Sequence, residues 1–325
     1  MQRKRIGQLL ALFLAFGLWI GMSNPGTVHA GAVITSGPVS MGIFDEGHLN
    51  FSGVGLFLAG VGDAIVPGCL CEGWGVAGDG ISGWGSVDNG GISNLTNDSF
   101  TSGASTATSI VHLTSLPSLS VTQAYAPSAG APTALFEDMV TISNTGGSTI
   151  TDIRYRRTMD WDVPPTTFFE YVTVGGLPAT NVLFSSDDGF ADSDPLAGPS
   201  FLDPSTVNVN FTDNGPADHG AVFDLGFGDL LAGESMSFSI FYGATYSEFS
   251  ALTALSAVGA EVYSLGQQAG DPLGGTPGTY IWGFKGVGGI VVPPPPSVPE
   301  PSVLLLLGSG LVGLGGFSAW RKRRS

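Results

Sequence analysis

Turns that contain glycine and proline divide this chain into short segments, and their spacing constrains the fold more than any other feature. The sequence of 325 residues contains 50 glycines and 21 prolines. The clearest turns, at 144–147, 175–178, 187–189 and 213–216, belong to a pattern of roughly 8–12-residue spacing that is typical of all-β proteins. Because 43% of the residues are hydrophobic, the segments between turns can bury a core. We therefore expect an all-β protein, built as a large antiparallel β-sandwich.

Several segments between the turns alternate polar and apolar residues, which is the pattern of a half-buried antiparallel strand. Residues 236–242 (MSFSIFY) and 207–211 (VNVNF) show it most clearly. The predicted strands are residues 39–44, 54–59, 109–113, 119–125, 135–144, 149–161, 168–174, 207–212, 221–227 and 235–242, with 280–284 as a candidate last strand.

One segment of the body predicts a helix. Residues 245–248 (TYSE) have the form of a capping box, and Phe249, Leu252 and Leu255 follow at helical spacing. We expect this short helix to pack against a sheet edge or between the late strands.

The charges are distributed unevenly along the chain. The whole sequence has 27 acidic and 11 basic residues, but between residues 31 and 297 only Arg154, Arg156, Arg157 and Lys285 are basic. All the acids except Glu300 lie there too, which leaves this region a net charge of −22 (4 basic minus 26 acidic residues). Binding to phosphate backbones needs clustered Lys and Arg, so we expect no nucleic-acid partner. Cations are the expected partners instead.

The first 30 residues have the pattern of a secretory signal peptide. A basic start is followed by an apolar stretch from Ile6 to about Met22, then Pro25 and a small-residue cleavage site that ends at Ala30. We predict removal by signal peptidase after Ala30. The alternative is a retained N-terminal anchor, since the apolar stretch is near the lower length limit for a membrane span. The protein is exported in both cases.

The other end of the chain has three parts in series. A proline-rich spacer occupies residues 293–298, an uncharged apolar segment follows at 303–320, and the basic tail Arg321, Lys322, Arg323 and Arg324 comes last. Eighteen helical residues reach roughly 27 Å, close to the thickness of the hydrocarbon layer. The sequence therefore predicts a transmembrane helix at 303–320. The basic tail would remain in the cytoplasm, so the body would lie on the opposite side of the membrane.

The C-terminal end also resembles a known sorting signal. Val298, Pro299, Glu300 and Pro301, followed by the apolar segment and the arginine-rich tail, are similar to the PEP-CTERM signal of bacterial exosortase substrates. The resemblance implies a Gram-negative-type bacterium that makes exopolysaccharide, and an exosortase that cuts near the Pro-Glu-Pro motif. The protein would be anchored in the inner membrane before processing, and would then reach the cell surface or the extracellular matrix. A permanent single-pass anchor is the alternative.

A charged segment in the middle of the body is the first candidate site. If residues 154–162 (RYRRTMDWD) form a strand, Arg154, Arg156, Thr158, Asp160 and Asp162 share one face, and Tyr155, Met159 and Trp161 share the other. One interpretation is an ion-pair network on a solvated or rim face, with Trp161 in the core. Another is carbohydrate contact by Asp160, Trp161, Asp162 and Glu170. A glycosidase using two of Asp160, Asp162 and Glu170 is the third, and needs two carboxylates that flank one bond.

Two acid-rich loops are a second candidate. Residues 187–194 (DDGFADSD) and 213–219 (DNGPADH) offer the hard oxygen ligands that Ca²⁺ prefers. We name a Ca²⁺ site at Asp187, Asp188, Asp192 and Asp194 as a hypothesis. Neither loop has EF-hand spacing, and Asp and Asn before Gly are also ordinary turn residues, so structural turns are the alternative.

Cys69 and Cys71 are the only cysteines of the chain. In an oxidising compartment we expect them to form a local disulfide, although an extended i, i+2 pair lies at the far limit of the Cα distance for such a bond. The alternatives are a buried reduced pair and an intermolecular crosslink. A metal site would need more Cys or His ligands than this region has.

The sequence divides into a signal peptide (1–30), a β-sandwich body (31–292), a spacer (293–298) and a sorting signal (299–325). It has no phosphate-binding loop, nucleophile elbow or His-Glu-x-x-His pair, so we expect no enzyme and no cofactor other than Ca²⁺. The predicted function is that of an exported surface or extracellular-matrix protein, associated with exopolysaccharide or biofilm, with Ca²⁺ bridging as the mechanism. The alternative is an exported carbohydrate-active enzyme or carbohydrate-binding module that uses Asp160, Trp161, Asp162 and Glu170.

Overall fold

A computed structural model describes residues 30–296 of the chain. The predicted signal peptide up to residue 29, the sorting residues Val298 to Pro301, the apolar segment 303–320 and the basic tail lie outside this range. No helix within residues 30–296 combines the length and the apolar character that a membrane span needs.

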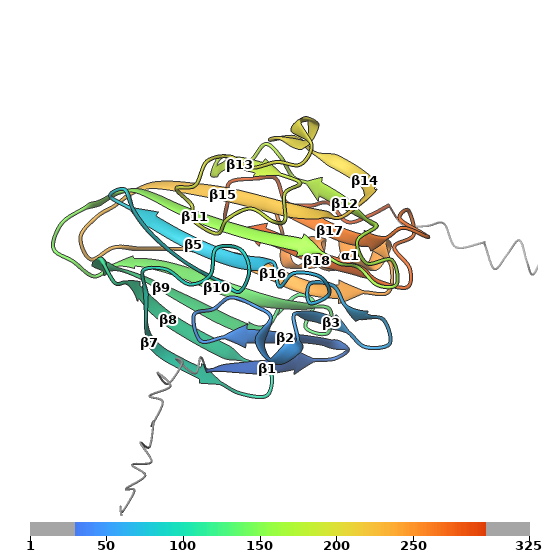
Figure 1. Cartoon of the computed structure of the whole chain (residues 1–325), viewed down its shortest axis with the longest axis horizontal. Coiled ribbons are helices and arrows are strands. Elements are labelled where there is room, and N and C mark those ends of the chain that lie inside the picture. Colours follow the sequence, from blue (N-terminus) through green and yellow to red (C-terminus); the bar gives the residue numbers. More distant parts are fainter. Residues whose placement is uncertain (1–29, 297–325) are drawn as a thin grey trace, which may run out of the picture.

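The described chain folds into three antiparallel sheets (Figure 1). The largest has nine strands in the order β14-β12-β17-β18-β16-β10-β9-β8-β7, and the second has five in the order β13-β15-β11-β5-β6. The third, β1-β2-β3-β4, is formed by the first strands of the chain. The bounds are β1 Gly31–Ser36, β2 Val39–Phe44, β3 Leu56–Leu58, β4 Gly62–Asp63, β5 Glu72–Gly78, β6 Ile81–Ser86, β7 Leu95–Ser102, β8 Ala107–Leu113, β9 Leu116–Pro127, β10 Leu135–Asn144, β11 Ile150–Trp161, β12 Glu170–Gly175, β13 Val182–Ser186, β14 Phe211–Ala217, β15 His219–Leu230, β16 Ser235–Thr245, β17 Val262–Gln268 and β18 Thr279–Lys285.

The five-stranded and nine-stranded sheets pack face to face through buried aromatic side chains. Tyr155 meets Phe238 at a ring-centroid distance of 5.1 Å, and Phe223 meets Trp282 at the same distance. Each pair joins one strand of the smaller sheet to one strand of the larger. Aromatic contacts of this kind bury large areas and hold two sheets at a fixed spacing. The predicted all-β sandwich is confirmed.

The predicted helix exists as α1, Glu248–Val258. Its N-cap is Ser247, whose hydroxyl accepts a hydrogen bond from the Ser250 amide, and not Thr245, which still belongs to β16. The helix packs on the face of the nine-stranded sheet, where Leu255 joins a buried cluster with Phe241 and Ile281. Of the two expected placements, the structure shows the one among the late strands and not the one at a sheet edge, because the small and apolar residues of α1 match the broad apolar face of β16 and β18.

Most predicted strands are present, with 39–44 and 135–144 matching β2 and β10 at both ends. The prediction of a strand at 207–212 was wrong, since its first residues form turns and only Phe211 begins β14. Asn208 and Asn210 bind backbone groups with their side chains there, which competes with ladder pairing. Residues 213–216 are also no tight turn. They form part of β14, whose pairing with β12 is interrupted by bulges.

Both faces of the central strand β11 are covered. Arg156 pairs with Asp224 and donates to the carbonyl of Asp192, in the segment that lies over the outer face. Arg157 points between the sheets and pairs with Glu72. Both arginine side chains are buried, at 1% and 0% exposure. The ion pairs expected on a solvated or rim face are therefore mostly internal, and of the three arginines of this strand only Arg154 pairs with its acid, Asp152, near the surface.

A buried carboxyl in the larger sheet gives a first testable prediction. Asp138 on β10 is fully buried, and burial raises its pKa to about 7 while nearby Arg157 acts in the opposite direction. Because the folded pKa lies above the unfolded value, Asp138 makes the fold less stable as pH rises from about 4 to about 7. Asp138→Asn should therefore be stabilising relative to the native chain at pH 8, by about 1–3 kcal/mol. Urea unfolding at pH 4.5 and pH 8 measures this difference, and a gain of equal size at both values would contradict it.

Candidate metal centre

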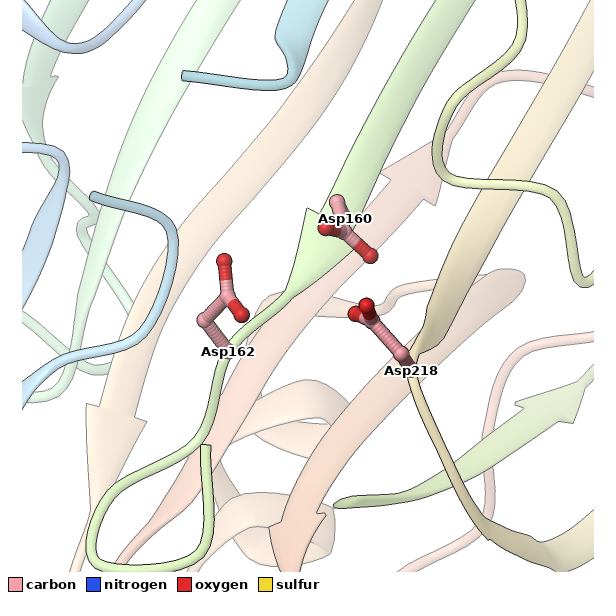
Figure 2. Close-up of side chains that lie close together, drawn as sticks. All are labelled: Asp160, Asp162 and Asp218. Atoms are coloured by element: carbon pink, nitrogen blue, oxygen red, sulfur yellow. The ribbon is translucent and has the colours of Figure 1, made fainter. Parts of the chain in front are cut away.

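Three aspartates converge where β11 ends and β15 begins (Figure 2). Asp160 is near the end of β11, Asp162 follows it, and Asp218 directly precedes β15. One carboxylate oxygen from each lies within 4.8 Å of the others. Figure 2 shows the three carboxylates turned toward one another from two neighbouring stretches of backbone. This is a spacing at which one cation can be held by all three.

A fourth carboxylate lies near these three. Glu170 is the first residue of β12, and its Oε1 accepts a hydrogen bond of 3.1 Å from the backbone amide of His219. The charges of Asp160, Asp162 and Asp218 raise the pKa of Glu170, although Glu170 is not among the acids whose oxygens lie within 4.8 Å of one another. We call Asp160, Asp162, Glu170 and Asp218 the carboxylate cluster.

The backbone fixes the cluster from several sides. The amide of Asp160 donates to the carbonyl of Cys71, and that of Asp162 donates to the carbonyl of Ala64. Gly220, next to His219 on β15, lies so close to β11 that a Cβ there would collide with the Met159 carbonyl oxygen. Glycine at this position therefore lets Asp218 reach Asp160.

Three members of the cluster are buried, and several of their carboxylate oxygens lack hydrogen-bond partners. Asp160, Asp162 and Glu170 are 2%, 0% and 0% exposed, whereas Asp218 is exposed. Both carboxylate oxygens of Asp162, Oδ1 of Asp160 and Oε2 of Glu170 have no hydrogen-bond partner. Buried polar atoms are almost always paired, and a bound cation could satisfy these four oxygens.

Burial also raises the pKa values of these groups. Desolvation is the main cause for all of them, and it raises the pKa of Asp160 to about 8, of Asp162 to about 7 and of Glu170 to about 9. The neighbouring carboxylates raise the pKa further, for example Asp162 acting on Asp160. The pKa of Asp218 is raised as well, chiefly by burial. A cation would reverse this by favouring the charged forms.

Within residues 30–296, the four arginine and lysine side chains make their contacts elsewhere. Arg154, Arg156 and Arg157 pair with acids outside the cluster, and Lys285 donates to the carbonyl of Val258. His219 lies next to Asp218 in the chain, but its ring is 3.8 Å from a carboxylate oxygen of Asp187. The negative charge of the cluster is therefore not balanced by an arginine or lysine side chain of this part of the protein.

A disulfide between Cys69 and Cys71 lies against the cluster. The two Cα atoms are 5.1 Å apart, and Cys69 Sγ lies 3.6 Å from Oδ2 of Asp160. A disulfide sulfur has no proton to donate, so this is a packing contact and not a hydrogen bond. Phe168 packs beside Gly68, close to the Asp162 carboxylate. The bridged loop and this ring therefore lie against the buried side of the site.

Trp161 does not share this site. Its ring is fully buried between the sheets, and its indole nitrogen donates to the Ser264 hydroxyl at 3.0 Å. The prediction that Trp161 contacts carbohydrate as an aromatic platform was therefore wrong. Side chains alternate along β11, so Trp161 points into the core and Asp160 points away from it.

The four acids named as a Ca²⁺ site are not brought together by the fold. Asp188, Asp192 and Asp194 each accept from the backbone amide two residues further on, namely those of Phe190, Asp194 and Leu196. Asp187 accepts from the amides of Leu202 and Asp203, which lie 15 and 16 residues away in the chain. Among the described residues, the acids close enough to share a metal ion are Asp160, Asp162 and Asp218. Asp188, Asp192 and Asp194 thus behave as turn-forming residues, whereas Asp187 joins its loop to a more distant segment.

A pocket of about 290 Å³ opens beside the cluster. Its walls include Asp187, Leu202, Asp203, Asn214, Asp218 and His219. Asp218 belongs to both the pocket and the cluster. The buried members of the cluster, Asp160, Asp162 and Glu170, are not among the pocket's lining residues.

The comparisons with known proteins concern the two parts of the chain separately. Residues 297–324 match the family model of the PEP-CTERM protein-sorting motif, so the chain carries the sorting signal that its sequence predicts. This motif implies export and processing by an exosortase at the cell surface. Comparison with curated proteins gives no match.

The body has a distant structural likeness. The crystal structure of a putative aldose 1-epimerase from Escherichia coli K12 is similar at a TM-score of 0.29 and 11% sequence identity, covering 82% of this chain and 94% of that chain. A likeness at this level carries no information about the activity of the present protein.

Proposed function

We propose that this chain is a non-enzymatic surface or extracellular-matrix protein that binds Ca²⁺ at the carboxylate cluster and associates with exopolysaccharide or biofilm through that ion. The sorting motif at 297–324 supports the destination. The observation that carries the binding proposal is the set of unpaired carboxylate oxygens on Asp160, Asp162 and Glu170, all buried. Carboxylate oxygens are the ligands that Ca²⁺ prefers, and one ion can satisfy several of them at once.

The type of ligand favours Ca²⁺ over transition metals. The cluster offers only oxygen atoms, and its cysteine neighbours are held in a disulfide. Zinc and copper sites rely on nitrogen and sulfur ligands. Mg²⁺ prefers strict octahedral geometry with several retained waters, which suits a dry cluster less well than the flexible coordination of Ca²⁺.

Binding to the folded protein can be measured directly. Addition of Ca²⁺ to the metal-free chain should release or absorb heat in calorimetry, and should raise the free energy of unfolding by about 2.7 kcal/mol at a hundredfold excess over Kd. Asp162→Asn and Glu170→Gln should each weaken binding at least about tenfold. Glu234→Gln, at an exposed acid of the β15–β16 turn, is the matched control and should bind as the native chain does. Absence of both heat and stabilisation would remove the proposal.

Retention in the matrix is tested on cells. If Ca²⁺ links the protein to exopolysaccharide, washing with a chelator should release most of it, and a wash with Ca²⁺ present should not. Full retention after the chelator wash would leave the Ca²⁺ site standing, but would contradict the bridging role.

One observation favours a second candidate, an exported carbohydrate-active enzyme. The raised pKa values of Asp160 and Glu170, about 8 and about 9, would keep these groups protonated at neutral pH, as a general acid requires. Against this, both groups are buried and face other carboxylates, whereas glycosidase carboxylates flank the sugar bond. Release of reducing sugar from exopolysaccharide by the native chain, lost in Glu170→Gln, would favour the enzyme.

A further inference from the structure

The pocket beside the carboxylate cluster is positioned to bring a ligand to the bound ion. Asp218 is the exposed member of the cluster and is also part of the pocket wall. The other three members are buried. A ligand in the pocket could therefore contact an ion at the cluster next to Asp218.

A second, independent observation points to a ligand at the same place. His219 lines the pocket, its side chain is buried at 2% exposure, and its Nε2 has no hydrogen-bond partner. The other ring nitrogen, Nδ1, lies 3.8 Å from the Asp187 carboxylate. A buried nitrogen without a partner is costly, and a hydroxyl group of a ligand in the pocket would satisfy it.

The charge of the site selects the class of ligand. Three ionised carboxylates around one Ca²⁺ leave a net charge of about −1, and Asp187 and Asp203 add further acids to the pocket wall. A ligand that carries a carboxylate would be repelled. Ca²⁺ accepts six to eight oxygens, so it can take neutral hydroxyl oxygens in addition to the cluster. The wall acids can accept hydrogen bonds from those same hydroxyls.

This inference rests on the proposed Ca²⁺ site. We propose that the pocket binds a neutral saccharide next to Asp218. Two adjacent hydroxyl groups of the sugar would bind the ion and complete its coordination. Leu202, which is 50% exposed on the pocket wall, provides an apolar contact for the carbon face of the sugar ring. Negatively charged uronate chains are therefore not the ligand of this site.

The test uses the full-length chain and two sugars of matched length. Neutral mannose oligosaccharides and acidic galacturonate oligosaccharides are titrated into the protein with excess Ca²⁺, and again with EDTA. We expect the neutral sugar to bind at least about tenfold more tightly than the acidic one, and its binding to be lost with EDTA. Equal or tighter binding of the acidic sugar, or neutral binding that persists in EDTA, would overturn the inference.

Variants separate this inference from the Ca²⁺ site itself. Leu202→Trp should fill the pocket and abolish sugar binding, while the heat of Ca²⁺ binding stays unchanged. Leu231→Trp, at an exposed leucine outside the pocket, is the matched control. If Leu202→Trp fails to fold, Asn214→Leu on β14 tests the same wall. If the native chain binds Ca²⁺ but not the neutral sugar, the sugar inference is wrong and the Ca²⁺ proposal stands. If the native chain does not bind Ca²⁺, both proposals are wrong.

Discussion

Replacing Arg157 with methionine is expected to lower the free energy of unfolding by about 3–5 kcal/mol. The Arg157 guanidinium is fully buried between the sheets, where it pairs with Glu72 and donates to Oε1 of Gln123 at 2.8 Å. It also lies 5.3 Å from the centre of the Tyr242 ring. Removing it leaves the Glu72 carboxylate as an unpaired buried charge, which is far more costly than the loss of the pair itself.

Chemical denaturation of Arg157→Met measures this loss, and two further variants show its origin. Arg154→Met removes an exposed pair with Asp152 and should cost no more than about 1 kcal/mol. The double variant Arg157→Met with Glu72→Leu removes both charges, and should recover a large part of the stability because no charge is left uncompensated. If the Arg154 and Arg157 variants lose equal stability, burial is not the cause.

Metal-free protein is expected to lose stability steadily as pH rises from about 4 to about 9. The folded pKa values of Asp162, Asp160 and Glu170, about 7, about 8 and about 9, lie above those of the unfolded chain. The folded state therefore holds more protons than the unfolded state within this window, and the free energy of unfolding falls with pH there. Below pH 4 the groups are protonated in both states and the effect is absent. Each pKa unit corresponds to about 1.36 kcal/mol, so the combined loss should reach several kcal/mol.

Calcium should remove most of this dependence. The ion binds the ionised carboxylates, so at high pH it replaces the protons that the cluster loses. Urea unfolding between pH 4 and pH 9, in EDTA and in excess Ca²⁺, gives the two profiles to compare. The double variant Asp160→Asn with Glu170→Gln should be flatter than the native chain in EDTA and should gain little from Ca²⁺. Parallel slopes in EDTA and Ca²⁺ would show that the cluster is not the metal site.

The sequence predicts the fold class because strand alternation and turn residues are local signals. Segment 135–144 was found at its exact bounds, since its buried and exposed positions alternate as the sequence does. The repeated Gly-Trp-Gly of β5 (EGWGVAG) and β6 (ISGWGS) indicates only a glycine-rich hairpin or loop, and the strand bounds could not be predicted because glycine carries no alternation signal. Because these glycines have no side chains, other chain segments can approach closely. A Cβ at Gly75, for example, would collide with the Ser193 carbonyl oxygen. Such tertiary contacts cannot be seen from one segment at a time.

The candidate site was predictable in part. Placing Asp160 and Asp162 on one face of a strand followed from alternation alone, and Glu170 was grouped with them as a nearby acid. Asp218 appeared in the sequence only as one acid of a loop at 213–219. Its place opposite Asp160 depends on the pairing of β15 with β11, which aligns His219 with Trp161. Nothing local to either segment encodes that register, because it is set by packing between the sheets.

Both edges of the nine-stranded sheet are irregular, and this bears on how copies of the protein behave when crowded. Strand β14 forms one edge, carries Pro216 without an amide hydrogen, and is bulged against β12. Strand β7 forms the other, with a register shift between Asn97 and Ser99. Straight open edges can pair with the edge of a second molecule and seed fibrils, and bulges and proline prevent this. A surface layer dense in this protein should therefore remain an assembly of separate molecules along these edges, free of cross-β aggregation.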